Sequence, residues 1–174
     1  MIRQTIAALL LSAAVSIPAA IPSAMPASAD GTAKDAVARG KYLVTVISCG
    51  DCHTPGHLLG KPDMARMLGG SDVGFEIPGL GVFHGSNLTP DMETGIGGWT
   101  EEQIVTAIRT GKRPDGRMLA PSMPWMSFAA LSDEDAHAIA SYLKTLPPVA
   151  NKVPGPFGAT DKPTGLVMRI SAPQ

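Results

Sequence analysis

The pattern of apolar and polar positions predicts three helices in this chain of 174 residues. The first covers residues 33–49, where Val37, Val44 and Ile47 recur at helical spacing. Gly40 lies in the middle of this segment and lowers helix stability relative to alanine. We therefore expect a second helix to cross the first one closely at Gly40.

Two further helices begin at residues that can cap a helix N-terminus. Thr100 followed by Gln103, and Ser132 followed by Asp135, both have capping-box spacing. Gly111 is expected to end the first of these two helices. The apolar positions that would face the core are Ile104, Ala107 and Ile108 in the second helix, and Ala136, Ile139, Ala140, Leu143 and Leu146 in the third.

The segments between and after these helices show no sustained period. Residues 54–98 are rich in glycine and proline and predict a long ordered loop, in which Val73–Ile77 and Gly81–His84 could pair as a small hairpin. Loops of this length usually carry function or wrap around something. Residues 149–174 form a proline-rich tail that we expect to run extended over the surface.

The start of the chain has the pattern of a secretory signal peptide. Arg3 is the only charge before Asp30, an apolar run occupies residues 6–17, and small residues precede and include Ala29. This pattern predicts cleavage after Ala29 and a periplasmic location. The apolar run is shorter than the roughly 20 residues of a membrane-spanning helix, and we expect no spanning segment in the mature chain.

Composition narrows the possible functions. The formal net charge of -1 argues against a nucleic-acid partner bound through its phosphates. Aromatic residues are only 5% of the chain, so its core should be thin and another group is expected to help fill it. The two cysteines, Cys49 and Cys52, are too few and too close together for a disulfide framework.

Cys49, Cys52 and His53 form the pattern C-x-x-C-H, at which haem is attached in c-type cytochromes. Each thiol adds to one vinyl group of haem, and the following histidine supplies the proximal iron ligand. A thioredoxin-like C-x-x-C would follow a strand, whereas the preceding segment here is helical. A zinc site would need further ligands at suitable spacing. The single copy of the motif predicts one haem.

From residue 33 to residue 146, the chain resembles a class I c-type cytochrome with one haem. The resemblance implies an all-α, cytochrome c-like helical fold around one covalent haem, with a long loop insertion and an extended C-terminal tail. The implied cytochrome domain covers residues 30–148, after a signal peptide at 1–29 and before the tail at 149–174. The matching stretches are Gly95-Ile96, residues 99–104, Met123-Pro124-Trp125, residues 131–135 and Tyr142-Leu143.

The chain offers several candidates for the distal iron ligand. A low-spin electron carrier needs a second axial ligand, which is typically methionine. Met123 is the preferred candidate, since it is held before a proline and precedes the closing helix by the family's usual short interval. Met118 and Met126 are the rival methionines, and His84 in the long loop is the histidine alternative.

The resemblance also implies supporting roles for residues around the haem. Trp99 matches a family tryptophan that donates a hydrogen bond to a haem propionate. Gly40 and Tyr142 match the positions at which the first and last helices cross. We further expect Thr54-Pro55, directly after the histidine, to supply the backbone carbonyl that selects the imidazole tautomer.

With both axial positions filled, the iron has no open site for a substrate, so the implied role is electron transfer and not catalysis. Residues 87–91 and the tail most resemble bacterial periplasmic cytochromes that serve dehydrogenases. The implied partners are a dehydrogenase donor and a cytochrome or terminal oxidase acceptor. Residues 56–98 and 149–174 are either a docking surface or a cover for the haem edges. The alternative function is a haem enzyme or gas-binding sensor with an open or labile distal site.

Overall fold

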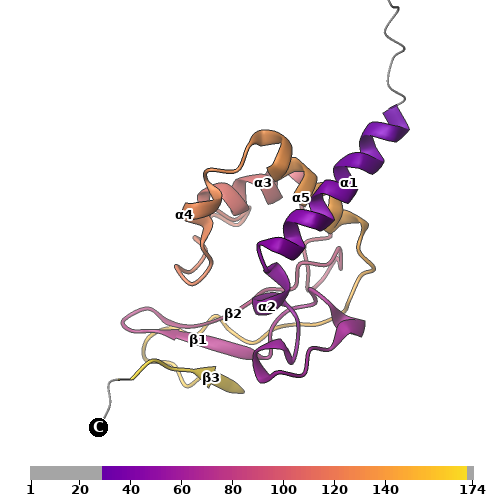
Figure 1. Cartoon of the computed structure of the whole chain (residues 1–174). Coiled ribbons are helices and arrows are strands. Elements are labelled where there is room, and N and C mark those ends of the chain that lie inside the picture. Colours follow the sequence, from indigo (N-terminus) through magenta and orange to yellow (C-terminus); the bar gives the residue numbers. More distant parts are fainter. Residues whose placement is uncertain (1–28, 172–174) are drawn as a thin grey trace, which may run out of the picture.

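Helices and a small sheet lie on opposite sides of the fold in the computed structural model, which describes residues 29–171 (Figure 1). The predicted signal peptide lies outside the described residues, apart from Ala29. Within residues 29–171, no helix is both long enough and apolar enough to cross a lipid bilayer. The helices are α1 (Ala29–Val46), α2 (Cys49–His53), α3 (Glu101–Thr110), α4 (Trp125–Phe128) and α5 (Asp133–Thr145), and two short 3₁₀ turns, η1 (His57–Leu59) and η2 (Met64–Arg66), follow α2.

The first and last long helices cross at Gly40, as the sequence predicts. A Cβ atom on Gly40 would lie 1.9 Å from the carbonyl oxygen of Ala138 and 2.8 Å from Cβ of Tyr142. Only glycine therefore allows α1 and α5 to approach this closely. The crossing also brings Val44 and Ile139 into one buried cluster, in which each is 1% exposed.

Capping residues define the ends of α3 and α5. Thr100 and Gln103 form the predicted reciprocal capping box of α3, and Gly111 ends that helix with φ at 73°. The Ser132 hydroxyl accepts a hydrogen bond from the Asp135 backbone N–H, but no reciprocal bond completes a box at α5. A single side-chain cap still satisfies one of the free N–H groups at the start of a helix.

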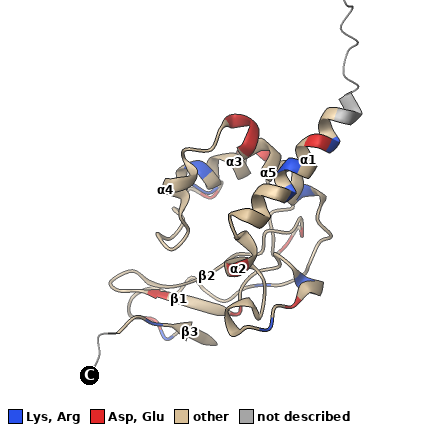
Figure 2. Ribbon diagram, viewed as in Figure 1, with Lys and Arg blue, Asp and Glu red and all other residues tan. Residues whose placement is uncertain are grey.

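Acidic residues gather at the first turn of α5, where they complement the positive end of the helix dipole (Figure 2). Two of them also connect α5 to neighbouring helices. Asp135 pairs with Arg39 of α1 at 2.8 Å, and Asp133 pairs with Arg109 of α3. The Arg39 guanidinium lowers the pKa of the Asp135 carboxyl.

The predicted hairpin is present, and the C-terminal tail adds a third strand to it. β1 (Val73–Ile77) and β2 (Gly81–His84) pair antiparallel, with Phe75 opposite Phe83. β3 (Leu166–Met168) pairs parallel to β1, so the strand order is β2-β1-β3. β3 is not predicted from the sequence, because a strand of three residues in a proline-rich tail shows too little alternation.

The tail is tied to the domain before it reaches the sheet. The Asn87 side-chain amide donates to the Val149 carbonyl at 2.6 Å, and the Val149 N–H donates to the Thr89 hydroxyl at 3.0 Å. Farther along, Phe157 and Val82 exchange two backbone hydrogen bonds of 3.0 Å. The expected extended tail is therefore an integral part of the fold.

Substitution of Gly40 by alanine tests the close crossing of α1 and α5. The added methyl group would overlap the Ala138 carbonyl, so we expect the free energy of unfolding to fall by about 1–3 kcal/mol or more. Denaturant unfolding of the haem-loaded protein measures this change. Gly98→Ala is the matched control, because the nearest atom to its Cβ, Cε of Met92, lies 4.0 Å away. Equal stability of both variants would contradict the crossing.

Candidate functional site

A tight turn between α1 and α2 places the C-x-x-C-H motif on a helical turn of its own. Ser48 adopts a left-handed conformation, with φ at 60° and ψ at 38°, immediately before Cys49. Non-glycine residues rarely adopt this conformation, and such strain is common at functional sites. The short helix α2 then presents Cys49, Cys52 and His53 to one cavity, and neither cysteine forms a disulfide.

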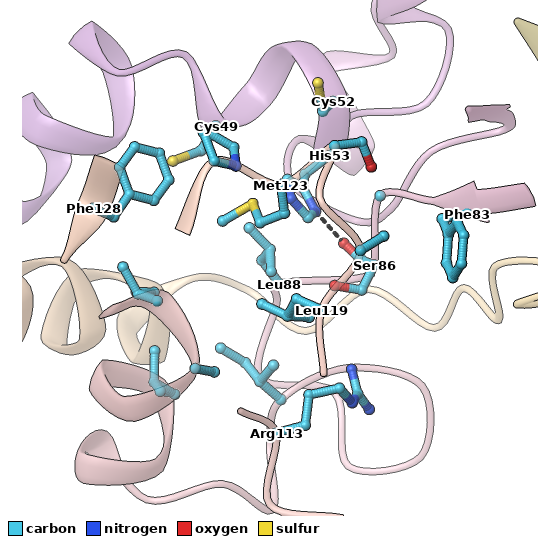
Figure 3. Close-up of a pocket in the computed structure, with 18 of the residues that line it drawn as sticks. Cys49, Cys52, His53, Phe83, Ser86, Leu88, Arg113, Leu119, Met123 and Phe128 are labelled. Carbon is cyan, nitrogen blue, oxygen red and sulfur yellow. Dashed lines mark hydrogen bonds between the residues drawn. The ribbon is translucent and has the colours of Figure 1, made fainter. Parts of the chain in front are cut away.

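The cavity lies between α2, the hairpin and the segment that precedes α4, and has a volume of about 380 Å³ (Figure 3). Cofactor cavities in proteins are typically about 300–1,000 Å³ and mostly apolar. The wall here is also mainly apolar, with a few polar groups. The apolar side chains that line it include Phe75, Phe83, Leu88, Ile96, Ile104, Leu119, Phe128, Ile139 and Leu143.

His53 is held in one orientation by a backbone carbonyl. Its Nδ1 lies 2.6 Å from the Ser86 carbonyl oxygen, and the side chain is buried (Figure 3). A carbonyl oxygen can only accept, so Nδ1 carries the proton and Nε2 keeps its lone pair in the neutral ring. Burial lowers the pKa of His53, and the hydrogen bond to Ser86 opposes this shift only in part. The neutral imidazole is the form that binds metal.

The carbonyl that selects this tautomer was assigned wrongly from the sequence. The sequence predicts that Thr54-Pro55 supplies it, but Ser86, 33 residues after the histidine, does so. The Thr54 hydroxyl instead accepts a hydrogen bond from the Leu68 N–H. Local sequence carries no signal for Ser86, because its carbonyl is brought to His53 by the tertiary fold and not by proximity in the chain.

Gly85 allows the end of the hairpin to approach the motif. A Cβ atom at this position would lie 1.7 Å from the Cys52 carbonyl oxygen and 3.4 Å from Nδ1 of His53. Any larger residue would push the chain away from α2, and Ser86 would move with it. Gly85 is therefore part of the site, although the sequence analysis did not single it out.

Before a group is attached, burial favours the neutral thiol form of both cysteines. Burial raises the pKa of Cys49 to about 11, a backbone hydrogen bond opposes this shift in part, and the charge of Asp51 adds to it. Burial also raises the pKa of Cys52, with a further contribution from Asp51. The raised pKa values disfavour the thiolate on which a redox C-x-x-C depends.

The structure separates the three methionine candidates. Met123 is half-buried and lines the cavity, whereas Met118 and Met126 are 49% and 61% exposed and line no part of it. His84 also lines the cavity, and neither of its ring nitrogens has a hydrogen-bond partner. Met123 and His84 thus remain as the distal candidates that could face a bound group.

The remaining predicted residue, Trp99, lines the same cavity and has a basic neighbour. The Arg113 guanidinium lies 5.0 Å from the centroid of the Trp99 ring. Arg113 and Arg117 both line the cavity. Arg109, by contrast, pairs with Asp133 at the surface. The cavity therefore brings together Cys49, Cys52, His53, Trp99 and Met123.

The residues present fit a covalently held haem. Two unpaired thiols and an imidazole nitrogen with a free lone pair face one cavity, whose apolar wall suits a flat macrocycle. Basic side chains on the same cavity suit the carboxylates that haem carries. A helical fold built around such a cavity defines a cytochrome c-like domain.

Comparison with known proteins agrees with this class. The family model for cytochrome c matches residues 37–147, and the chain belongs to the cytochrome c family. Its members carry haem c and transfer electrons. The chain is thus an electron-transfer cytochrome c with a covalent haem c.

Several relatives are named as cytochrome subunits of dehydrogenases. The chain is 39% identical over 121 residues to the cytochrome c subunit of alcohol dehydrogenase (quinone) from Gluconobacter oxydans. The aligned region covers 68% of this chain and 23% of the relative. It is 32% identical over 130 residues to the fructose dehydrogenase cytochrome subunit of Gluconobacter japonicus, covering 71% and 25%. It is 37% identical over 120 residues to the gluconate 2-dehydrogenase cytochrome c subunit of Pantoea cypripedii, covering 67% and 24%. The chain spans about a quarter of the length of these relatives.

Removal of both thiols tests how the haem is attached. A Cys49→Ser/Cys52→Ser variant should give no haem stain on a denaturing gel, because only thioether bonds survive denaturation. Asp51→Asn, between the two cysteines, is the control and should stain like the unchanged chain. Stain that persists in the double variant would place the attachment elsewhere.

Proposed function

We propose that this chain is an exported electron carrier with one haem, which takes single electrons from a dehydrogenase and passes them to a cytochrome or terminal oxidase. The observation that carries the proposal is one cavity lined by both thiols, the His53 ring and Met123. One C-x-x-C-H motif supports a single haem. The leader-like first 29 residues support export to the periplasm and cleavage after Ala29.

His53 and Met123 are the proposed axial ligands. The hydrogen bond to Ser86 holds the His53 ring so that Nε2, and not Nδ1, is available to iron. Met123 offers a thioether from a segment that is held by local backbone hydrogen bonds. One of them runs from the Met123 N–H to the Ala120 carbonyl at 2.9 Å. When bound, haem supplies an iron that gains and loses one electron. Cys49 and Cys52 hold it covalently, and Trp99 donates to a propionate.

The chain's role is then positioning and shielding. The apolar wall excludes water and keeps the surroundings of the iron at low dielectric, which favours outer-sphere electron transfer over chemistry at the iron. Because the curated relatives are named as dehydrogenase subunits, a dehydrogenase is the proposed donor. In this proposed role, the chain itself catalyses no substrate conversion.

Truncation of Met123 tests the distal ligand. Met123→Ala should open an axial position, so that the ferrous protein binds carbon monoxide and the sulfur-to-iron band of the ferric form disappears. Loss of the thioether should also lower the midpoint potential by on the order of 0.1 V, within the ~0.8 V that axial ligands span. Met126→Ala is the control, since Met126 is 61% exposed and does not line the cavity.

The same measurement separates an electron carrier from the alternative function. A high-spin spectrum and rapid carbon monoxide binding by the unchanged protein would contradict axial ligation by Met123. That outcome would instead support a haem enzyme or gas sensor with an open distal site. A bis-histidine spectrum that is unchanged in Met123→Ala would point to His84.

Co-purification tests the proposed partner. A tagged, haem-loaded chain expressed in its native host should recover a dehydrogenase from the periplasmic or membrane fraction. The recovered complex should reduce the cytochrome when the dehydrogenase substrate is added, as followed by the visible spectrum of the haem. The Cys49→Ser/Cys52→Ser variant is the control for reduction. Recovery of the cytochrome alone, with no reducing partner in any fraction, would contradict a dehydrogenase as the bound electron donor.

A further inference from the structure

A second cavity of about 400 Å³ adjoins the haem cavity. The two cavities share part of their lining, including His84, Trp99, Arg113 and Arg117. The second cavity is bounded on its other side by residues 152–156 of the tail, which we call the tail strap. The tail strap lies beyond residue 147, where the match to the cytochrome c family model ends.

Hydrogen bonds fix the tail strap at both ends. Before it, the Asn151 N–H donates to the Thr94 hydroxyl at 3.0 Å, and the Asn151 side-chain amide donates to the Gly69 carbonyl at 2.8 Å. After it, Phe157 and Val82 exchange backbone hydrogen bonds of 3.0 Å. The position of the tail strap over the cavity is therefore determined by the body of the domain.

The second cavity has an excess of positive charge. Three cations line it, Arg113, Arg117 and Lys152, against the single carboxylate of Glu93. Arg113 pairs with Asp115 at 3.2 Å, but within residues 29–171 neither Arg117 nor Lys152 forms an ion pair. Burial lowers the pKa of Arg117, and the nearby charge of Arg113 lowers it further. Such a cluster favours an anionic group in the cavity.

His84 has unsatisfied hydrogen-bonding capacity at the boundary of the two cavities. Both of its ring nitrogens are buried without a partner, and its ring packs edge-on against Phe157 at 6.2 Å between centroids. A buried N–H group without an acceptor is destabilising. His84 can therefore donate to an acceptor that enters from either cavity.

We propose that His84 and Arg117, together with Lys152 of the tail strap, bind the two carboxylates of the haem. Haem carries its vinyl groups and its carboxylates on opposite edges, so attachment at Cys49 and Cys52 directs the carboxylates away from α2. The second cavity supplies the cations and the donor that these carboxylates require. This inference rests on the proposed monohaem site, and it makes the tail a part of that site.

Neutralisation of Lys152 tests the role of the tail strap. Lys152→Gln should change the ratio of oxidised to reduced haem at a fixed potential about three- to tenfold in favour of the oxidised form, which corresponds to ~30–60 mV. The loss of a cation near the haem stabilises the ferric state, so the midpoint potential falls. Lys152→Arg should restore it. Lys162→Gln removes an exposed tail lysine that does not line the cavity, and should leave the potential unchanged.

Infrared difference spectroscopy on reduction provides a second readout. In His84→Gln the carboxylate bands of the haem should shift, because their hydrogen-bond donor has changed. His137→Gln, at an exposed position on α5, is the control. The inference would be overturned if the potential is unchanged in Lys152→Gln and the carboxylate bands are unchanged in His84→Gln. With haem stain and low-spin spectrum intact, this outcome would leave the proposed function standing. Absence of haem from the unchanged chain would overturn the proposed function instead.

Discussion

The hydrogen bond between Nδ1 of His53 and the Ser86 carbonyl connects the two halves of this protein. The bond is 2.6 Å long. It joins His53, the last residue of α2, to the segment directly after β2. Because a carbonyl cannot donate, this one contact determines which ring nitrogen is protonated and which faces the cavity. The close approach that it requires is possible only because residue 85 is glycine. The backbone after β2 therefore controls the chemistry of a side chain on a helix.

A buried polar network keeps Ser86 in place. Asn87, which is 1% exposed, accepts hydrogen bonds from the Thr89 N–H and hydroxyl, and donates to the Thr94 hydroxyl and the Val149 carbonyl. Every polar group of this side chain is thus satisfied, which is the condition under which a buried network adds rigidity. The network links the residue after Ser86 to the start of the tail. The tail, the long loop and the histidine consequently form one connected structure.

The sequence predicts those features that depend on local pattern. Helix periodicity and capping residues such as Thr100 give α3 and α5, and the glycine at position 40 marks the crossing of α1 and α5. Motif spacing likewise brings the cysteines and His53 together. Features that depend on contacts between distant segments are not predicted from the sequence. The Ser86 carbonyl reaches His53 only through the hairpin, and β3 exists only because β1 offers it a free edge.

The distribution of aromatic residues explains how a chain with so few of them builds a stable interior. The largest fully buried side chains include Leu68, Ile139 and Val44, and none of them is aromatic. Phe83, Phe128 and Trp99 are only half-buried, and they lie on the wall of the haem cavity. A macrocycle bound in this cavity would add to their contact area. A ligand that binds only the folded state stabilises that state. Haem bound in this cavity would couple its attachment to folding, since these three aromatic side chains would pack against it.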